Sequence, residues 1–353
     1  MSKAAELAAL IANVNNGSSL ANKNFIINGG MTVAQRTTSA TGVGSTNSYP
    51  TVDRFKVSGF GSTAGRLTME QSTDHPSGFS NSVKLTCTTA DTSIGAGEGL
   101  TISQDLEGQD LQQLKKGTGD AVPITVSFWV KGNASATYTC ELRDADNSRF
   151  NSQAFSVTTS WNRIELTFAG DTSGVLDNDT SSSLQLFIWL HAGSTYTGGT
   201  HTSNAWHTTA NQRVVDSQTS FCDSTSRTFF ITGVQMEIGE KATEFEVEPF
   251  ARTLSKCRRY YQQQAIGTLY MNDLPNCAYI YRSFELPAKP RATPTIAIVT
   301  QFQYWTGGSS TNWTPTFGVS QDNLAFASVN VYGSSLTNGK GIHTGTFSAD
   351  AEL

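Results

Sequence analysis

Apolar and polar residues alternate with a period of two through much of the first 250 residues. Val126, Phe128 and Val130 show the pattern clearly, with polar or aromatic residues between them. Successive side chains of a β-strand point to opposite faces, so each such run predicts a strand with one buried face. The runs lie at 25–31, 53–58, 66–70, 82–88, 100–102, 124–130, 138–142, 164–168, 184–190 and 229–237. Strands of this number and length favour a double-sheet jelly roll over a seven-strand immunoglobulin-like sandwich.

The stretch 229–250, FFITGVQMEIGEKATEFEVEPF, is interpreted as the closing strand of this sandwich and its exit. Val234, Met236 and Ile238 form its expected buried face, with polar residues between them. A turn is expected at 239–241, followed by a second short strand at 244–248. That strand ends at Pro249, which has no N–H to donate to a neighbouring strand.

After Pro249 the periodicity becomes helical and then returns to that of strands. Phe250, Leu254, Cys257 and Tyr261 are spaced i, i+4, i+7 and i+11, which predicts a helix. Strand-like runs follow at 278–286, 295–303, 317–321 and 324–332, with a loop at 306–315. The chain is therefore expected to be all-β, with an N-terminal helix and linker at 1–22, a jelly-roll β-sandwich at 23–249 and a smaller C-terminal antiparallel β-domain at 250–353.

The N-terminal segment 2–14 predicts a short amphipathic helix. Leu7, Leu10, Ile11 and Val14 form one apolar stripe, and Leu7, Leu10 and Val14 match heptad a and d positions. A helix this short needs a partner for that stripe. The partner is the body of the protein, copies of the helix in a homotrimer, or a docking surface on another protein. We expect attachment or oligomerisation because the polar linker 15–23 separates the helix from the first strand.

Composition supports an all-β fold and narrows the partners. Of the 353 residues, 37% are hydrophobic and only 15% are charged, with 31 glycines, which favours short strands and polar turns over helices. The net charge is −5 and no basic run is present, so nucleic acid is not an expected partner. No run is apolar and long enough for membrane insertion, and no secretory signal precedes the first strand.

The five cysteines contain no CxxC pair. Cys87 and Cys140 occupy apolar strand positions, which predicts buried free thiols and suits synthesis in a reducing cytoplasm.

Several longer motifs resemble virion-associated fibre and structural proteins of tailed bacteriophages, in particular those of marine bacteria. The similar motifs are AAELAALI at 4–11, NFIINGGMTVAQR at 24–36, TVDRF at 51–55, SFWVKG at 127–132, SW-R-E-TF at 160–168, GVQMEIGEKATEFE at 233–246, CRRYYQ at 257–262 and ADAEL at 349–353. The middle part is also similar in pattern to carbohydrate-binding jelly-roll modules. The resemblance implies a structural or receptor-binding role in a virion, after synthesis in the host cytoplasm, with other virion proteins as partners of the N-terminal helix.

Aromatic residues on nominally solvated positions are the candidate ligand-binding residues. Flat rings with polar edges stack on sugars, so these positions predict contact with a host surface glycan. The candidates are Trp129, Phe187 and Trp189 on the outer faces of strands, Trp206 in the long connection 191–227, and Tyr304, Trp305 and Trp313 in the expected loop after 303. The alternative is that these rings are covered by the long connection, by the second domain or by a neighbouring subunit.

Metal ligands and cofactors are not expected from the sequence. His191, His201 and His207 share one connection but lack HxH or HxxxH spacing, so no transition-metal site is predicted. The stretches 144–147 and 177–179 contain Asp and Asn that would offer oxygen atoms to a structural Ca²⁺ ion. Neither follows the EF-hand pattern, and turn formation is the competing interpretation.

Catalytic motifs are missing as well. The sequence has no GxSxG or HExxH pattern, and no internal repeat like those of long β-helical spikes. We therefore expect no enzyme but a phage virion protein, a tail fibre or fibre-like appendage that contacts host glycans. A polysaccharide-degrading tail spike and a purely structural capsid decoration or head fibre protein are the alternatives.

Overall fold

The chain folds into two compact units, Met1–Phe250 and Ala251–Leu353. The computed structural model describes residue 3 and residues 22–266, 269–270, 279–305, 310–321, 327–334 and 341–353, with side chains at 22–266, 283–303, 312, 314–319 and 344–353. The predicted helix at 2–14, with Leu7, Leu10, Ile11 and Val14, lies outside the described residues. Its roles in attachment and trimerisation stay predictions.

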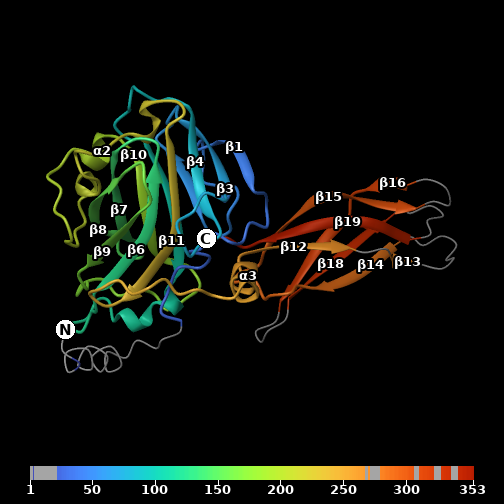
Figure 1. The fold of residues 1–353 in the computed structure, drawn as a ribbon. Coiled ribbons are helices and arrows are strands. Elements are labelled where there is room, and N and C mark those ends of the chain that lie inside the picture. The colour runs from blue at the N-terminus through green and yellow to red at the C-terminus, as the bar shows by residue number, and fades with distance from the viewer. Residues whose placement is uncertain are drawn as a thin grey trace. The chain divides into compact units, whose positions relative to one another are not determined.

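The first unit is built from two antiparallel sheets (Figure 1). The six-stranded sheet has the order β1-β3-β4-β11-β6-β9 and the five-stranded sheet the order β2-β5-β10-β7-β8. The strands are β1 (Ser39–Val43), β2 (Lys56–Phe60), β3 (Arg66–Ser72), β4 (Ser82–Thr89), β5 (Gly99–Glu107), β6 (Ile124–Gly132), β7 (Ala136–Asp144), β8 (Arg149–Val157), β9 (Asn162–Phe168), β10 (Ser182–Ala192) and β11 (Thr228–Ile238). Short helical turns in the connections are η1 (Gly108–Asp110), η2 (Gln112–Leu114), α2 (Ser194–Thr197), η3 (Ala210–Gln212) and η4 (Phe221–Asp223).

The core follows the predicted alternation. Phe128 and Val130 of β6 and Leu186 and Ile188 of β10 belong to one buried apolar cluster shared by the two sheets. Each such side chain contributes about 1.5–3 kcal/mol when fully buried. Shifting any of these strands by one residue would turn its apolar face to solvent, so the alternation also fixes the register. The jelly-roll β-sandwich is confirmed.

The sequence patterns do not predict two strands of the sandwich. β1 lies within the polar stretch 36–50, and Val43 is its one buried residue. In β8, Phe150 pairs with Arg143 on the outer face, whereas Phe155 pairs with Tyr138 on the core face. Apolar residues on both faces hide a period of two.

β11 occupies the centre of the six-stranded sheet, between β4 and β6. Its apolar residues in the core cluster are Phe229, Ile231, Val234 and Met236. Phe229 and Ile231 have odd numbers whereas Val234 and Met236 have even numbers, so strict alternation would place the two pairs on opposite faces. A β-bulge at Gly233 brings both pairs to the same face. The register with β6 shifts between Thr232 and Gln235, and Gly233 has a φ of +63°. Glycine adopts this left-handed conformation without the steric penalty of a Cβ atom.

The strand predicted at 25–31 is wrong, because this segment is a series of turns. Side-chain amides bind its backbone in place of a neighbouring strand. Gln104 Oε1 accepts the N–H of Ile27 at 2.8 Å, and Gln104 Nε2 donates to the carbonyl of Ile27 at 2.9 Å. Asn28 Oδ1 accepts the N–H groups of Thr32 and Val33, both at 3.0 Å. Asn28 also has a φ of +62°, which breaks the extended conformation.

The second short strand predicted at 244–248 is also wrong. This segment is irregular and lies against the outer face of the six-stranded sheet. Gln235 Oε1 accepts the N–H of Glu246 at 2.8 Å, and the carboxylate of Glu237 accepts the N–H and Oγ1–H of Thr243 at 2.8 and 2.7 Å. Gln235 and Glu237, the expected solvated face of β11, are therefore buried.

The second unit is the smaller antiparallel β-domain expected from the sequence. One sheet has the order β12-β19-β15-β16 with β13 beside β19, and the other has the order β14-β18-β17. Phe302 and Phe347 of the first sheet contact Phe317 of the second, with ring centroids 5.9 and 5.7 Å apart. The elements are α3 (Phe250–Arg258), β12 (Tyr261–Ile266), β13 (Leu269–Tyr270), β14 (Tyr279–Glu285), β15 (Thr295–Trp305), β16 (Ser310–Trp313), β17 (Thr316–Gln321), β18 (Ala327–Ser334) and β19 (Gly341–Asp350).

The helix predicted after Pro249 is α3, but it ends before Tyr261, which begins β12. β19 pairs with β12, β13 and β15, although its sequence contains too few apolar residues to predict a strand. β16 lies inside the expected loop 306–315.

The cysteines behave as predicted where the structure describes them. Cys87, Cys140, Cys222 and Cys257 are buried free thiols, and Cys277 lies outside the described residues. Burial raises the pKa of Cys87, Cys140 and Cys222, which keeps these thiols protonated and unreactive at neutral pH. Within the described part of the chain, every helix is too short or too polar to cross a membrane.

Candidate functional site

The outer face of the six-stranded sheet carries a pocket of about 250 Å³ around Trp129. Trp129 lies on β6 between its cross-strand neighbours Thr232 of β11 and Arg163 of β9. We call this surface the Trp129 pocket. Its lining residues are Ser77, Gly78, Phe79, Ser127, Trp129, Arg163, Gly233, Glu244, Phe245 and Val247.

Two segments outside the sheet form the aromatic walls of the pocket. The β3–β4 connection contributes Phe79 and the segment 243–247 contributes Phe245, with ring centroids 5.1 Å apart. The bulge in β11 makes room for them. A Cβ atom at Gly233 would lie 2.6 Å from Phe79 Cζ and 3.0 Å from Trp129 Cδ1. The missing side chain at Gly233 therefore lets the Phe79 and Trp129 rings approach the backbone of β11.

The charged residues of the pocket are Arg163 and Glu244. The Arg163 guanidinium donates to the carbonyl of Thr243 and lies 3.1 Å from Glu165. Glu244 lies in the same irregular segment. Its backbone carbonyl accepts a hydrogen bond from Gln235 Nε2 at 3.3 Å. Aromatic faces beside one guanidinium and one carboxylate can bind the apolar face of a ring and the hydroxyl groups at its edge.

A second aromatic group follows on the same face of β6, around Lys131. The Lys131 ammonium lies 5.4 Å from the Trp161 ring centroid and 4.8 Å from that of Phe230. Trp161 Nε1 donates to Asp74 at 3.0 Å, and Lys131 forms an ion pair with Asp74. The hydrogen bond from Lys131 lowers the pKa of Asp74, so this carboxylate is ionised at neutral pH. These contacts extend the aromatic surface beyond the pocket.

The aromatic pair predicted on β10 is covered, as the alternative interpretation held. Trp189 is fully buried. Tyr196 lies on it with ring centroids 5.0 Å apart, and the Arg213 guanidinium lies 5.0 Å from its ring centroid. Trp189 Nε1 donates to Glu141 at 2.7 Å. We do not retain a ligand-binding role for Trp189, and Phe187 is half-buried beside it.

Trp129 of β6 and the two aromatic residues of β10 lie in different sheets, so they do not form one binding surface.

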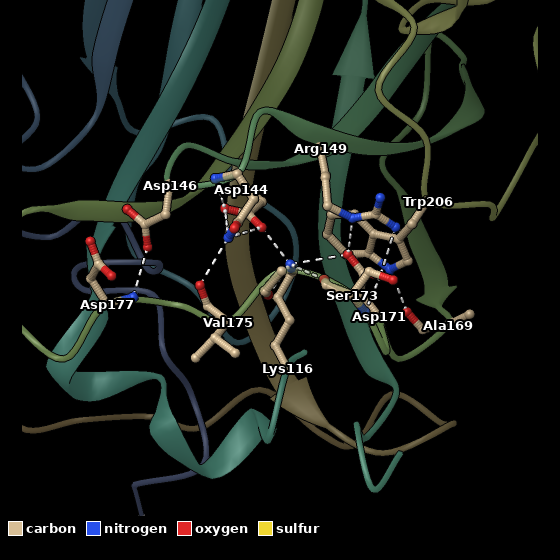
Figure 2. A network of polar contacts seen from close by, with 12 residues as sticks. Lys116, Asp144, Asp146, Arg149, Ala169, Asp171, Ser173, Val175, Asp177 and Trp206 are labelled. Carbon is tan, nitrogen blue, oxygen red and sulfur yellow. Dashed lines mark hydrogen bonds and ion pairs between the residues drawn. The ribbon is translucent and has the colours of Figure 1, made fainter. Parts of the chain in front are cut away.

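Lys116 lies between two buried carboxylates at the edge of the sandwich (Figure 2). Its ammonium forms ion pairs with Asp144 and with Asp171, the latter at 3.0 Å. It also donates to the carbonyls of Ser173 and Gly174 at 3.0 and 2.8 Å. The side chains of Lys116, Asp144 and Asp171 are at most 4% exposed. An ammonium group thus occupies a nest of oxygen atoms of the type that Ca²⁺ requires.

Arg149 completes this network. Its guanidinium donates two hydrogen bonds to the Asp171 carboxylate, at 2.7 and 2.8 Å. Burial raises the pKa of Asp171, but the hydrogen bonds from Arg149 and Lys116 outweigh burial, so the pKa lies below its usual value of 3.8.

The Asp- and Asn-rich stretches considered as Ca²⁺ ligands stabilise turns. Asp146 accepts the N–H of Asp177 at 2.9 Å, and Asp179 accepts the N–H of Ser181 at 2.8 Å. Asn147 donates to the carbonyl of Val175 at 2.9 Å. These contacts are of the kind that the turn-forming interpretation requires.

Trp206 has a packing role. Its ring lies over Lys116, whose ammonium is 5.2 Å from the ring centroid, and its Nε1 donates to the carbonyl of Ala169 at 2.7 Å (Figure 2). We therefore do not retain the predicted glycan contact at Trp206.

The last predicted ligand residues lie in strands and not in the expected loop. Tyr304 and Trp305 end β15 and Trp313 ends β16, with Trp305 opposite Ser310. Their side chains lie outside the described residues, and their glycan-binding role stays a prediction.

Of the pocket, the sequence identified only Trp129 as a ligand residue. Phe79, Arg163 and Phe245 reach it from three segments far apart in sequence. One signal was available: Gly233 interrupts the alternation between Ile231 and Val234, which indicates a bulge beside Trp129.

The first unit is thus a jelly-roll β-sandwich with an aromatic pocket on one outer face. No protein-family model matches the sequence, and no curated protein matches it. Solved structures with a similar fold include a family 30 carbohydrate-binding module, at 12% identity and a TM-score of 0.31, over 65% of this chain and 94% of the module. A family 61 carbohydrate-binding module in complex with β-1,4-galactotriose is 10% identical, with a TM-score of 0.31, over 62% of this chain and 100% of the module.

A third similar structure is the enzymatically active domain of tailspike protein 4 from bacteriophage CBA120. It is 12% identical with a TM-score of 0.31, over 62% of this chain and 22% of the tailspike chain. The present chain therefore spans about a fifth of the tailspike structure that it matches. At these identities and TM-scores the likeness concerns the arrangement of strands alone.

Proposed function

We propose that the chain is a non-enzymatic virion protein of a tailed phage, a tail fibre or fibre-like appendage, whose Trp129 pocket binds a glycan of the host surface. The observation that carries the glycan part is the pocket itself. Three aromatic rings, Trp129, Phe79 and Phe245, line it together with Arg163 and Glu244. A sugar ring presents an apolar C–H face to aromatic rings and hydroxyl groups to charged side chains.

The size and openness of the surface favour a short carbohydrate epitope. The pocket of about 250 Å³ is slightly smaller than most small-molecule sites, which measure roughly 300–1,000 Å³. The neighbouring Trp161 ring packs on the buried Phe230 ring and continues the aromatic surface. A longer glycan would extend from the pocket over the Trp161 ring.

A binding role is favoured over hydrolysis because the pocket has a single carboxylate. Glu244 is the one acidic residue among the described residues that line it. Most glycosidases use two carboxyl groups, roughly 5–10 Å apart, on either side of the scissile bond.

The virion location is supported by the sequence motifs that resemble phage fibre and structural proteins. A homotrimer and contacts with other virion proteins through the N-terminal helix belong to the same proposal.

A glycan array tests the binding role. The full-length chain is labelled and applied to an array of bacterial capsular and lipopolysaccharide glycans, alongside Trp129→Ala and Phe187→Ala. Phe187 is the matched control because it is a half-buried aromatic residue on the outer face of the other sheet. We expect Trp129→Ala to weaken binding by at least about tenfold, and Phe187→Ala to leave it unchanged.

Three results would contradict the proposal. A chain that binds no glycan supports the purely structural alternative. Equal binding by Trp129→Ala would instead show that the glycan binds outside the Trp129 pocket. New reducing ends after incubation with a bound polysaccharide would instead support the tail spike enzyme.

A further inference from the structure

The geometry points to a transition-metal site, of the type that binds Zn²⁺, formed by Asp91, Glu98 and His191. One ligand atom from each of the three side chains lies within 4.8 Å of the other two. The site belongs to the sandwich and is independent of the glycan-binding proposal.

His191 supplies the observation that singles out this cluster. Its side chain is fully buried, and among the described residues its Nε2 atom has no hydrogen-bond partner. Glu98 Oε2 is the nearby acceptor, but at 3.9 Å it is too far for a hydrogen bond. A buried polar nitrogen without a partner is unfavourable. Coordination of a metal ion by Nε2 would remove that penalty.

The other ring nitrogen is already fixed. His191 Nδ1 lies 2.7 Å from Ser220 Oγ. When Nδ1–H donates to Ser220, the lone pair of Nε2 faces the two carboxylates. Metal-bound histidines are oriented in this way by a hydrogen bond at the second nitrogen. Burial lowers the pKa of His191, which favours the neutral imidazole that binds metals.

The carboxylates are oriented by neighbours of their own. Among the described residues, no lysine or arginine forms an ion pair with either carboxylate. Two negative groups therefore lie beside a neutral imidazole without a cation. Asp91 Oδ2 accepts hydrogen bonds from Thr63 Oγ1 and Ala64 N at 2.9 and 2.8 Å. Glu98 Oε2 accepts a hydrogen bond from Gly95 N at 2.7 Å.

The set of donor atoms selects the ion. One imidazole nitrogen and two carboxylate oxygens suit Zn²⁺, whereas Ca²⁺ takes oxygen ligands. Zn²⁺ binds these atoms at roughly 2.0–2.2 Å in tetrahedral geometry, which places two ligand atoms about 3.3–3.6 Å apart. The ligand atoms therefore need to approach one another by at most about 1.5 Å from their present separation of up to 4.8 Å.

The three ligands come from two elements that the fold brings together. Asp91 and Glu98 belong to the connection between β4 and β5, and His191 lies near the end of β10. The carbonyl of Glu98 accepts the N–H of Gly193 at 2.8 Å, so the connection and the strand are already in contact. A bound ion would cross-link them. Asp91 and Glu98 are 7 residues apart, and Glu98 and His191 are 93 residues apart. This spacing matches no local motif, so the sequence predicts no such site.

Zinc titration of the metal-free chain tests the site. The full-length protein is treated with chelator, dialysed and titrated with ZnCl₂ in a calorimeter, and its thermal unfolding is recorded with and without the metal. We expect one Zn²⁺ per chain and a rise in unfolding temperature, and no such effect from equimolar CaCl₂. His191→Ala and Glu98→Gln are each expected to weaken Zn²⁺ binding by at least about 100-fold. His75→Ala, which removes an exposed histidine, is expected to retain it.

Glu98→Gln keeps the test decisive if His191→Ala does not fold. Glutamine has the same shape as glutamate, and Glu98 is only partly buried. Absence of Zn²⁺ binding by the parent chain overturns the inference. Unchanged Zn²⁺ binding by Glu98→Gln also overturns it. A loss of Zn²⁺ binding in His75→Ala equal to that in His191→Ala would do the same, because it would indicate surface histidines as the ligands.

Discussion

At the scale of single residues, side-chain amides replace missing backbone partners in both units. Gln104 binds both backbone groups of Ile27 in the sandwich. Gln262 does the same for Ala288 in the second unit, donating at 2.8 Å and accepting at 3.3 Å. Such a side chain imitates the edge of a neighbouring strand, so segments without a ladder stay ordered.

The ion-paired carboxylate of Asp171 is buried between Lys116 and Arg149, which gives a pH-dependent prediction. Because the folded pKa of Asp171 lies below 3.8, its contribution to stability is complete above that pH and is lost as the pH falls through the folded pKa. At pH 7, Asp171→Asn leaves Lys116 and Arg149 short of a partner. We expect a loss of about 3 kcal/mol in the free energy of unfolding, measured with urea.

The control is Glu70→Gln, which makes the same change in the exposed Lys84–Glu70 pair and costs less than about 1 kcal/mol. The difference between the parent chain and Asp171→Asn is expected to shrink as the pH falls from 3.8 through the folded pKa of Asp171. A difference that stays constant over this range would show that Asp171 acts through packing and not through its charge.

At the scale of elements, the bulge in β11 couples the register of the sheet to the Trp129 pocket. We predict that Gly233→Ala costs about 1–3 kcal/mol of stability, because alanine is strained at a φ of +63°. The new methyl group would also meet Phe79 and Trp129, so glycan binding is expected to fall with it. Urea unfolding and the glycan array measure the two effects.

Gly119→Ala is the matched control for this substitution. A Cβ atom at Gly119 meets no atom within 4 Å, so the change is expected to stay within about 0.5 kcal/mol. Equal effects of the two substitutions would show that the bulge has no special role.

Hydrophobic periodicity is sufficient to predict the strands that have one apolar face, and it does not predict the other strands. The strands around Phe128 and Ile188 follow from alternation, because their neighbours on the outer face are mainly polar. β8 and β19 do not, because apolar residues lie on both faces or are too few. The pocket needed more than periodicity: Phe79 and Phe245 come from connections whose paths depend on side chains such as Gln235. Local pattern contains no information about such long-range contacts.

At the scale of the whole molecule, we infer that the sandwich folds without the second unit. A chain of residues 1–250 is expected to unfold cooperatively in urea. A chain of residues 1–227 is expected not to fold, because it lacks β11 from the centre of the six-stranded sheet.

An intermediate chain, 1–242, separates folding from binding. It keeps β11 but loses Glu244 and Phe245, so we expect it to fold and to bind no glycan. Cooperative unfolding of the 1–227 chain would contradict the central role of β11.

The position of β11 also sets the order of events on the ribosome. Its neighbours β4 and β6 are complete at Thr89 and Gly132, but β11 begins only at Thr228. Synthesis of residues 133–227 takes roughly 5–20 s at about 5–20 residues per second. During that time the facing edges of β4 and β6 have no partner, and open edges pair readily with other chains. Nascent copies on one messenger are therefore most prone to aggregate just before the sandwich closes.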